Sequence, residues 1–453
     1  MAQAQRVLDP VTVGLPAYEA ANGGRAVAAA RAAEPIALIE TVEAAGLRGR
    51  GGAGFPTGTK WRTVASMRGT TEPAATVVVN AAEGEPGTLK DRTLLRRNPY
   101  RVLEGALIAA HAVGANEVVV GLKRTDDQVR ERVTAAIAEV RDAGWLDGID
   151  VRCATGVERY LLGEETALLE ALEGRPPFPR VAPPFRAGVD AAVTLVNNVE
   201  TLANVPSIVL DGPERFRAVG TQESPGTIVC TVSGRTTRAG VGEFALGTPL
   251  REVIDELGGG VLEPPIVAVL SGTANPILPA DALDAPVSWE GLTAAGGGLG
   301  SAGFIVIDAG VDVVAVAHGV SRFLSVESCG QCTPCKHDGL AITDVLDRIR
   351  RSDPDDDDLD RLPELLTGIT DGARCYLAQQ HQDVVQSLLA RFPDALAAHV
   401  EGRATEAEPF PVVPLVDIVD DEPVLALDEL AVLPDWGGGE ADSPSDRIDV
   451  RRS

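Results

Sequence analysis

The chain has 453 residues, enough for roughly two to four domains, and its 45 % hydrophobic and 23 % charged residues exclude an intrinsically disordered protein. Its 66 acidic and 40 basic residues give a formal charge of −26, which argues against nucleic acid and anionic lipid as bulk partners. No run of 18 apolar residues and no signal peptide is visible, so we expect a cytoplasmic protein that does not insert into a membrane directly.

Up to about residue 220, strand-like and helix-like segments alternate along the chain. Runs of β-branched residues predict three strands, at 76–80, 117–122 and 149–154. Apolar residues at helical spacing predict helices between them, at 102–113 and 129–140. Strands that alternate with helices of this length favour an α/β fold with a parallel sheet.

The pattern changes twice in the second half of the chain. From residue 221, short strand-like runs, Gly-rich turns and one helix predict a small α+β domain. From residue 311, helical stripes return, interrupted at 352–358 by a turn and a run of aspartates that we expect to be solvated. The residues after 400 are acidic and contain Pro and Gly, which predicts a partly ordered tail.

The strongest chemical signal is the cysteine pattern Cys329-Gly-Gln-Cys332-Thr-Pro-Cys335, followed by a remote Cys375. Three thiolates spaced three residues apart near a helix terminus, together with one distant thiolate, suit a cubane iron–sulfur cluster. A structural zinc usually takes two pairs of ligands from two separate turns, so zinc is the alternative with less support. The remaining two cysteines lie in strand-like runs and are expected in the core.

A second signal is the loop Gly49-Arg-Gly51-Gly52-Ala-Gly54, which satisfies the pattern G-x-G-x-x-G. The usual dinucleotide fingerprint follows a strand, whereas residues 41–47 are helix-like, so an ordinary Rossmann turn is not expected here. The loop backbone can still approach a phosphate or a ring closely, with neighbouring basic side chains supplying charge. A purely structural turn is the alternative.

Three further clusters combine Asn, Glu and Gly at expected strand ends or in loops, at residues 80–87, 160–166 and 196–201. Such side chains suit hydrogen bonds to a polar ring system and to ribitol or ribose hydroxyls. Each cluster alone is more often a helix cap or a turn. Together they indicate a cofactor site.

The chain resembles the NADH-binding flavoprotein subunit of bacterial complex I, a module that also occurs in NAD-linked hydrogenases and formate dehydrogenases. The resemblance covers about residues 14–400 and rests on five motifs in order, namely GLRGRGGAGFPTGTKW, VNAAEGEPGTLKDR, YLLGEETALLEALEG, NNVETLANVP and ESCGQCTPC. It implies an N-terminal segment with a Rossmann-like FMN- and NADH-binding domain (1–220), a ubiquitin-like β-grasp domain of the soluble-ligand-binding type (221–310), a helical bundle that binds a [4Fe-4S] cluster (311–400) and an acidic tail (401–453).

The resemblance also implies roles for individual residues. The residues that would line the flavin and nucleotide cleft are Gly49, Gly51, Gly52, Gly54 and Lys60. Those that would contact FMN are Asn80, Glu83, Tyr160, Gly163, Glu164, Asn197, Asn198 and Thr201. Those on the NADH side would be Phe55, Glu85, Glu165 and Phe185. The cluster ligands would be Cys329, Cys332, Cys335 and Cys375.

The implied activity is electron transfer, with no side chain needed as acid or base because FMN supplies the reactivity. NADH would deliver hydride to FMN, and electrons would pass singly to the cluster and on to a small ferredoxin-like or thioredoxin-like iron–sulfur partner, within a larger redox complex. Ala82 stands where the family has Asp, and Thr63 where it often has an aromatic residue. These departures support a second hypothesis, a divergent paralogue that exchanges electrons with a ferredoxin or another donor. A non-enzymatic scaffold with a structural metal is the third.

Overall fold

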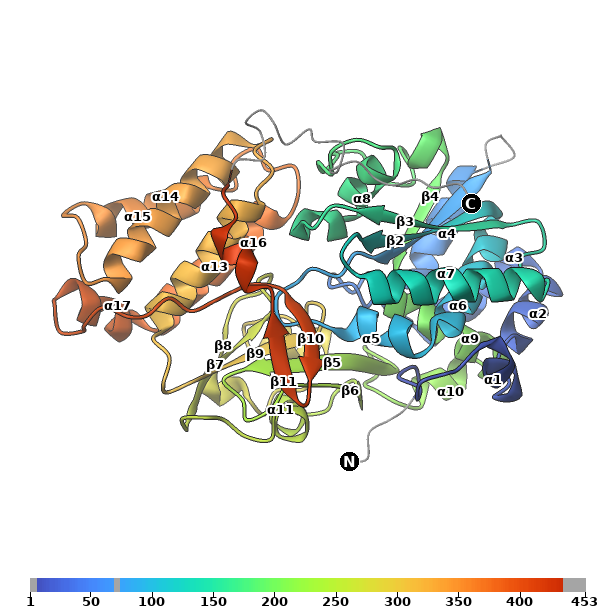
Figure 1. The fold of residues 1–453 in the computed structure, drawn as a ribbon, viewed down its shortest axis with the longest axis horizontal. Coiled ribbons are helices and arrows are strands. Elements are labelled where there is room, and N and C mark those ends of the chain that lie inside the picture. Colours follow the sequence, from blue (N-terminus) through green and yellow to red (C-terminus); the bar gives the residue numbers. More distant parts are fainter. Residues whose placement is uncertain (1–5, 69–73, 435–453) are drawn as a thin grey trace.

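The computed structural model describes residues 6–68 and 74–434. A parallel sheet with its helices, a smaller mixed sheet and a helical bundle lie side by side, and a C-terminal hairpin runs between them (Figure 1). The helices are α1 (Leu15–Ala20), α2 (Arg25–Arg31), α3 (Pro35–Ala45), α4 (Thr57–Arg68), α5 (Lys90–Arg97), α6 (Pro99–Val113), α7 (Asp127–Asp142), α8 (Glu165–Leu172), α9 (Val199–Asp211), α10 (Pro213–Arg217), α11 (Leu250–Gly258), α12 (Trp289–Ala294), α13 (Val313–Glu327), α14 (Thr333–Arg350), α15 (Asp358–Gly368), α16 (Leu377–Arg391) and α17 (Pro393–Val400).

Short 3₁₀ helices and the strands complete the inventory. The 3₁₀ helices are η1 (Tyr160–Gly163), η2 (Val189–Ala191), η3 (Ala280–Ala282) and η4 (Leu427–Ala431). The strands are β1 (Ala75–Ala81), β2 (Ala115–Lys123), β3 (Asp150–Gly156), β4 (Thr194–Asn198), β5 (Thr227–Gly234), β6 (Gly240–Ala245), β7 (Ile266–Ser271), β8 (Leu278–Pro279), β9 (Gly303–Asp308), β10 (Leu415–Val419) and β11 (Glu422–Leu425). The three strands expected in the first 220 residues are present, and β4 is an additional one.

The first sheet has the strand order β3-β2-β1-β4, and all its pairs are parallel. Side chains alternate between the faces of a strand, so Val77 and Val79 of β1 enter the large core that also contains residues of α6 and α9, whereas Val78 enters the core under α8. Coverage of both faces explains why β1 and β2 each carry three consecutive buried valines. The mixed α/β fold with a parallel sheet is therefore confirmed.

The second sheet is mixed, with the order β6-β5-β9-β7-β8. Strands β5 and β9 pair in parallel, and the other pairs are antiparallel. Helix α11 packs against β5 and β6 through Val253, Ile254 and Leu257. The short helix α12 joins the same core through Trp289 and Leu292, and a mixed sheet packed against α11 is the arrangement expected of a β-grasp fold.

The helical bundle buries the predicted apolar stripe of α14, formed by Ile342, Leu346 and Ile349. The expectation of a solvated charge run at 352–358 is wrong for Asp358, which is fully buried and accepts from the Arg348 guanidinium. This ion pair lowers the pKa of Asp358. An aspartate at the start of α15 is thus part of the packing between α14 and α15.

The C-terminal hairpin β10–β11 was not predicted by the sequence analysis. The Arg92 guanidinium of α5 donates to the carbonyls of Leu415 and Val416 at 2.5 and 2.9 Å. The Ala239 N–H donates to Asp421 O at 2.6 Å. Further along, the Arg322 side chain of α13 donates to the carbonyl of Leu430. The segment from 415 to 430 therefore contacts all three bodies, as its position in Figure 1 shows.

Within the described ranges, no helix is both long enough and apolar enough to cross a lipid bilayer.

A single buried carboxylate holds the N-terminal helices to the parallel sheet. Glu104 of α6 is 1 % exposed, and its Oε1 accepts from the backbone N–H groups of Ala26 and Val27 at 2.8 and 3.0 Å. Its Oε2 accepts from the Tyr18 hydroxyl at 2.7 Å. These N–H groups belong to the first turn of α2, where a helix has no partners of its own.

Glu104→Leu should therefore destabilise the protein by about 2–4 kcal/mol, because three buried donors lose their acceptor. Differential scanning calorimetry would record a lower Tm. The exposed Glu40→Leu substitution on α3 is the matched control and should leave Tm nearly unchanged. An equal Tm for the two variants would contradict this role for Glu104.

Candidate functional site

The Gly-rich loop connects α3 to α4 and is closed at its base by its own backbone. The N–H of Gly49 donates to Phe55 O at 2.9 Å, and Arg48 Nε donates to Gly54 O at 2.9 Å. Within the described part of the chain, the N–H groups of Gly51, Gly52 and Ala53 have no acceptor. Consecutive exposed N–H groups in a loop can bind a phosphate or a polar ring edge.

Trp289 of α12 supports this loop from the mixed-sheet body. Its Nε1–H donates to Gly52 O at 3.2 Å, and its ring lies 4.4 Å from the Arg48 guanidinium carbon. Gly54 has φ +64°, and a Cβ there would lie 2.3 Å from Trp289 Nε1. Glycine is therefore required at position 54, and the sequence analysis missed Trp289 because it lies far from the loop in the chain.

The carboxyl ends of β1 and β4 lie next to each other beside the loop. Asn80 and Asn198 are register partners in this pair. The Asn80 Nδ2 donates to Gly163 O at 2.8 Å, which ties β1 to the η1 turn. Asn197 Oδ1 accepts from Trp61 Nε1 at 2.8 Å. Ligands of open α/β sheets bind at this edge, so the structure brings these predicted residues to the expected place.

Several predicted FMN-contacting side chains make hydrogen bonds within the protein. Glu83 accepts from the N–H groups of Asp91 and Arg92 at 3.2 Å each, at the start of α5. Glu164 is the N-cap of α8 and accepts from the N–H groups of Thr166 and Ala167, and burial raises its pKa. These carboxylates fix the helices that border the site.

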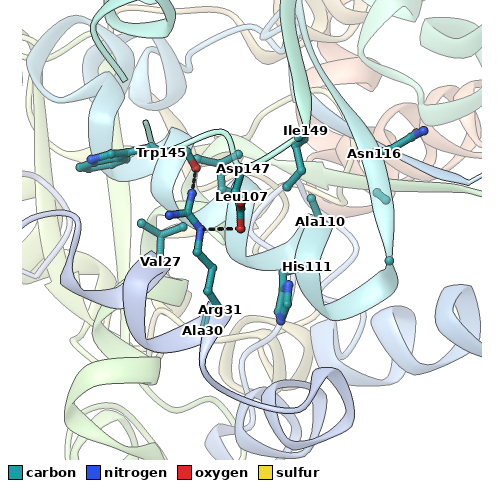
Figure 2. Close-up of a pocket in the computed structure, with 13 residues that line it drawn as sticks. Val27, Ala30, Arg31, Leu107, Ala110, His111, Asn116, Trp145, Asp147 and Ile149 are labelled. Atoms are coloured by element: carbon teal, nitrogen blue, oxygen red, sulfur yellow. Dashed lines mark hydrogen bonds and ion pairs between the residues drawn. The ribbon is translucent and has the colours of Figure 1, made fainter. Parts of the chain in front are cut away.

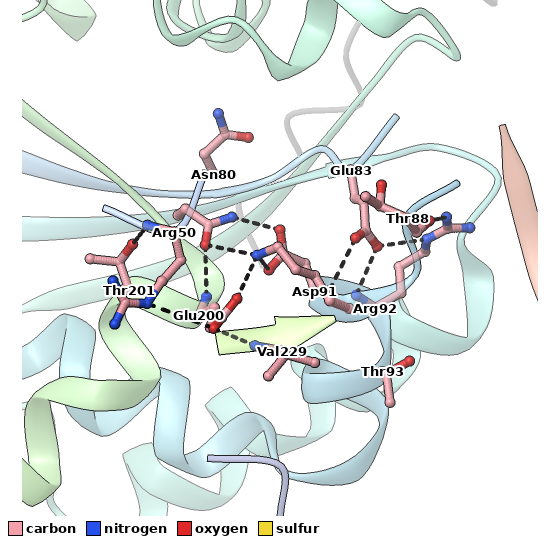
Figure 3. Close-up of polar contacts among 12 residues, drawn as sticks. Arg50, Asn80, Glu83, Thr88, Asp91, Arg92, Thr93, Glu200, Thr201 and Val229 are labelled. Atoms are coloured by element: carbon pink, nitrogen blue, oxygen red, sulfur yellow. Dashed lines mark hydrogen bonds and ion pairs between the residues drawn. The ribbon is translucent and has the colours of Figure 1, made fainter. Parts of the chain in front are cut away.

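A network of buried charges lies directly beneath the loop (Figure 3). The backbone N–H of Arg50 donates to Thr201 Oγ1 at 2.8 Å, while its fully buried guanidinium lies 3.9 Å from Glu200. Burial lowers the pKa of Arg50 to about 10. Glu200 accepts from Lys90 Nζ at 2.8 Å and from the Val229 N–H at 2.9 Å.

Asn198 and Asp91 complete this network. Asn198 caps α9 through Oδ1 and donates from Nδ2 to Asp91 at 2.6 Å. Burial raises the pKa of Asp91 to about 6, with Lys90 acting in the opposite direction. A Cβ on Gly51 would lie 3.2 Å from the Asn198 Cβ, so the loop packs closely on this residue. Asn198 and Thr201 thus support the loop with their side chains.

The residues predicted on the NADH side occupy three different environments. Lys60 of α4 forms an ion pair with Glu165 at the first position of α8. Phe55 is 54 % exposed on the Gly-rich loop. Phe185 instead packs against the large hydrophobic core. Among these residues, Glu165 is held by an ion pair, and Phe55 and Phe185 contribute apolar rings.

Glu85 lies where the three bodies meet. Its carboxylate accepts from the Tyr160 hydroxyl at 2.6 Å and from Thr273 Oγ1 at 2.9 Å. The Tyr160 hydroxyl also lies 3.3 Å from Gln380 Oε1 of α16. Burial raises the pKa of both Glu85 and Tyr160. Glu85 and Tyr160 thus join the parallel-sheet body to the mixed sheet and the bundle.

The four predicted cluster cysteines line one hollow. Its volume is about 270 Å³, including the part that is open to solvent. Its other lining residues come from η1, the segment around Pro179, the connection between α13 and α14 and the start of α16, and are Leu161, Pro179, Ser328, Gln331, Arg374 and Leu377. Burial raises the pKa of the Cys375 thiol to about 12 and also raises that of Cys335. Such thiols need a bound metal to become thiolates at neutral pH.

The spacing of these thiols fits a cluster better than a single ion. Within the described residues, Asp355, Asp357 and Asp358 form the one group of His, Cys, Asp or Glu side chains whose three ligand atoms all lie within 4.8 Å of one another. No three of the cysteine sulfurs come that close. A tetrahedral zinc with Zn–S bonds of about 2.3 Å would hold its sulfurs about 3.8 Å apart. A four-iron cluster needs the wider spacing.

The η1 turn touches both candidate sites. The Gly163 carbonyl accepts from Asn80 at the edge of the parallel sheet, and Leu161 lines the cysteine hollow. The Tyr160 N–H donates to Glu327 at 2.9 Å, at the end of α13 and two residues before Cys329. One four-residue turn therefore separates the two sites.

A second cavity, of about 710 Å³ by the same measure, lies near the amino end of β2 (Figure 2). Its Arg31 side chain donates to the Trp145 carbonyl and lies 3.5 Å from Asp147, and His111 Nε2 lies 3.3 Å from Ala33 O. Because cofactors of open α/β sheets bind at the carboxyl ends, this cavity is at the wrong end of the sheet.

Comparisons with known proteins agree with this geometry. Residues 42–207 match the Nuo51 FMN-binding domain, and residues 315–399 match the NADH-ubiquinone oxidoreductase-F iron–sulfur binding region. The chain is 40 % identical over 403 residues to the second F subunit of the NADH-quinone oxidoreductase of Rhizobium meliloti (strain 1021), covering 86 % of this chain and 95 % of that protein. It is 37 % identical over 418 residues to the NADH-quinone oxidoreductase F subunit of Mycobacterium bovis (strain ATCC BAA-935 / AF2122/97), covering 88 % and 94 %.

Among solved structures, a chain of an NAD⁺-reducing [NiFe]-hydrogenase in the H₂-reduced state matches with a TM-score of 0.77 and 34 % identity, covering 89 % of this chain and 68 % of that one. The sequence matches extend over most of both proteins, and the structural match extends over the parallel sheet, the mixed sheet and the bundle together. The expected resemblance is confirmed, and the chain belongs to the family of NADH-quinone oxidoreductase F subunits.

Proposed function

We propose that this chain accepts hydride from NADH on bound FMN and passes the electrons singly to a [4Fe-4S] cluster held by Cys329, Cys332, Cys335 and Cys375. The observation that carries this proposal is the η1 turn, which contacts the sheet edge through Gly163 and lines the cysteine hollow through Leu161. FMN supplies the exchange between two-electron and one-electron chemistry when it is bound. The protein holds the two groups close together.

In this proposal the flavin is recognised mainly by backbone groups. Gly49, Gly51, Gly52 and Gly54 let the loop approach the ring, and the N–H groups of Gly51 and Gly52 are available to it. Asn80 and Gly163 mark the sheet edge, while Glu83, Glu164, Asn197, Asn198 and Thr201 hold the surrounding backbone in place. The Lys60–Glu165 pair borders the nucleotide side.

We propose that the chain has four functional segments. They are the FMN and NADH domain (1–220), the β-grasp domain (221–310), the cluster domain (311–400) and the acidic tail (401–453). The partner is a small iron–sulfur protein that takes electrons from the cluster. We also propose that the chain works in the cytoplasm as a peripheral subunit of a larger redox complex, which its charge of −26 favours over direct contact with anionic lipid.

The second candidate function is a divergent member that uses a ferredoxin instead of NADH. Ala82 supports it, because the methyl group leaves no carboxylate at the end of β1, where the family has Asp. Thr63 supports it as well, since its hydroxyl donates to Thr59 O within α4 and offers no aromatic face to an adenine.

Anaerobic titration with NADH tests the proposed function directly. We expect flavin absorption bands and a broad iron–sulfur shoulder in the visible spectrum, both bleached by stoichiometric NADH and not by NADPH. Cofactors that respond to a reduced ferredoxin and not to NADH would contradict the NADH proposal and favour the second candidate. A colourless protein that contains zinc would contradict both.

Cys375→Ser should remove the cluster and leave the flavin. Loss of one of four thiolates leaves an incomplete ligand set. Iron analysis and the absorbance of the shoulder should fall severalfold, with unchanged FMN content and circular dichroism. Cys153→Ser, on β3 and outside the hollow, is the matched control and should keep its iron. Equal iron in the two variants would show that Cys375 is not a ligand.

Glu165→Gln tests the proposed nucleotide side. The substitution keeps the size of the side chain and removes the charge that pairs with Lys60. A hydrogen bond to a charged group contributes about 1.5–3 kcal/mol. If the Glu165 charge is lost from the NADH side, KM for NADH should therefore rise about tenfold or more, while FMN content stays the same. The exposed Glu131→Gln on α7 is the control. An unchanged KM would contradict the placement of Glu165 beside NADH.

A further inference from the structure

One lysine joins the two helices on either side of the cysteine triplet. Helix α13 ends at Glu327 with Ser328 as its C-cap, and α14 begins at Thr333, so the first two ligands lie in the connection. The last carbonyls of a helix have no partner within it. Lys336, in the first turn of α14, donates from Nζ to Ser325 O at 2.9 Å and to Ser328 O at 2.8 Å. Its ammonium group therefore satisfies the end of α13 and fixes the connection.

Two neutral donors reach the ligand sulfurs from the same connection. Ser328 Oγ lies 3.2 Å from Cys335 Sγ, and Gln331 Nε2 lies 3.6 Å from Cys329 Sγ. Once a thiolate is bound to iron, the hydroxyl can only donate to it. Because Lys336 holds the carbonyl of Ser328, the position of the Ser328 hydroxyl depends on the lysine.

Lys336 is not the only positive charge near the hollow, because Arg374 lines it and Arg159 lies close by, 4.0 Å from the Glu327 carboxylate. The chain has a net charge of −26, so its overall field opposes the addition of an electron. Arg374 lines the hollow but is exposed, so solvent and salt screen its charge. Lys336 is only partly exposed and sits directly after the ligand Cys335. Charge and hydrogen bonds at the sulfurs are among the factors that set the potential of an iron–sulfur cluster.

We propose that Lys336 is a positioning residue that raises the reduction potential of the cluster, through its own charge and through the Ser328 hydroxyl that it holds against Cys335. This inference rests on the proposed function, because it needs a cluster on the four cysteines. It assigns to Lys336 and Ser328 a control over how readily the cluster accepts an electron from the flavin, without any contact with NADH.

The test is a redox titration of the cluster in the full-length holoprotein, in which electron paramagnetic resonance monitors the reduced cluster. Lys336→Gln keeps an N–H donor for the carbonyls but removes the charge, and it should shift the one-electron equilibrium about tenfold toward the oxidised cluster. A tenfold shift corresponds to a potential lower by about 59 mV. Lys336→Arg keeps the charge and should restore the equilibrium to within about threefold of wild type, as half of that decade is about 30 mV. Ser328→Ala should give a smaller shift in the same direction as Lys336→Gln.

Iron content is measured for every variant, so that loss of the cluster is not mistaken for a change in potential. The inference would be overturned if Lys336→Gln and Ser328→Ala both kept their iron and had the wild-type potential. The proposed function would remain intact in that case. A wild-type protein without a cluster signal would overturn the proposed function as well. If Lys336→Gln alone failed to retain iron, Ser328→Ala and Lys336→Met would serve as the test. A wild-type potential in both of these variants would overturn the proposal.

Discussion

The burial of Glu200 is the constraint on which the rest of the site depends. Its carboxylate is 0 % exposed and lies between Lys90 Nζ at 2.8 Å, the Val229 N–H at 2.9 Å and the Arg50 guanidinium at 3.9 Å. These partners come from α5, from β5 of the mixed sheet and from the Gly-rich loop. A buried charge that loses a partner costs several kcal/mol, so the three segments cannot move apart independently. The rigidity of the loop therefore comes from charges that are buried away from solvent.

This constraint explains how a loop rich in glycine can act as a defined surface. Glycine lets the backbone approach a ligand but adds conformational freedom that must be removed elsewhere. Arg50 removes it by donating from its N–H to Thr201 and from its side chain to Thr227 O at 3.2 Å. Trp289 fixes the other side by donating to Gly52 O. The remaining N–H groups are then held in one arrangement, which is the preorganisation that a cofactor site requires.

The sequence predicted local features well and long-range partners poorly. The cysteine spacing and the helix before the Gly-rich loop are local patterns, and the structure has the four cysteines in one hollow and α3 before the loop. The support by Trp289 and the burial of Asp358 depend on residues that meet only after folding, which spacing along the chain does not encode. The hairpin at 415–425 was missed because its segment is acidic and short. Its backbone is held by Arg92 and by Ala239, which are distant in sequence.

The same distinction explains how the nucleotide side can differ from the family pattern while the electron path is kept. In the proposed function the electrons pass η1, where Gly163 is held by Asn80 and Leu161 lines the cysteine hollow. Ala82 contributes a backbone N–H to Asn80 Oδ1 at 3.2 Å, a bond that any side chain at this position would leave in place. The hydrogen bonds of Thr63 to the described residues stay within α4. Neither residue belongs to the buried charge network, so substitutions at these two positions change the side chains offered to an electron donor without disturbing the contacts of η1.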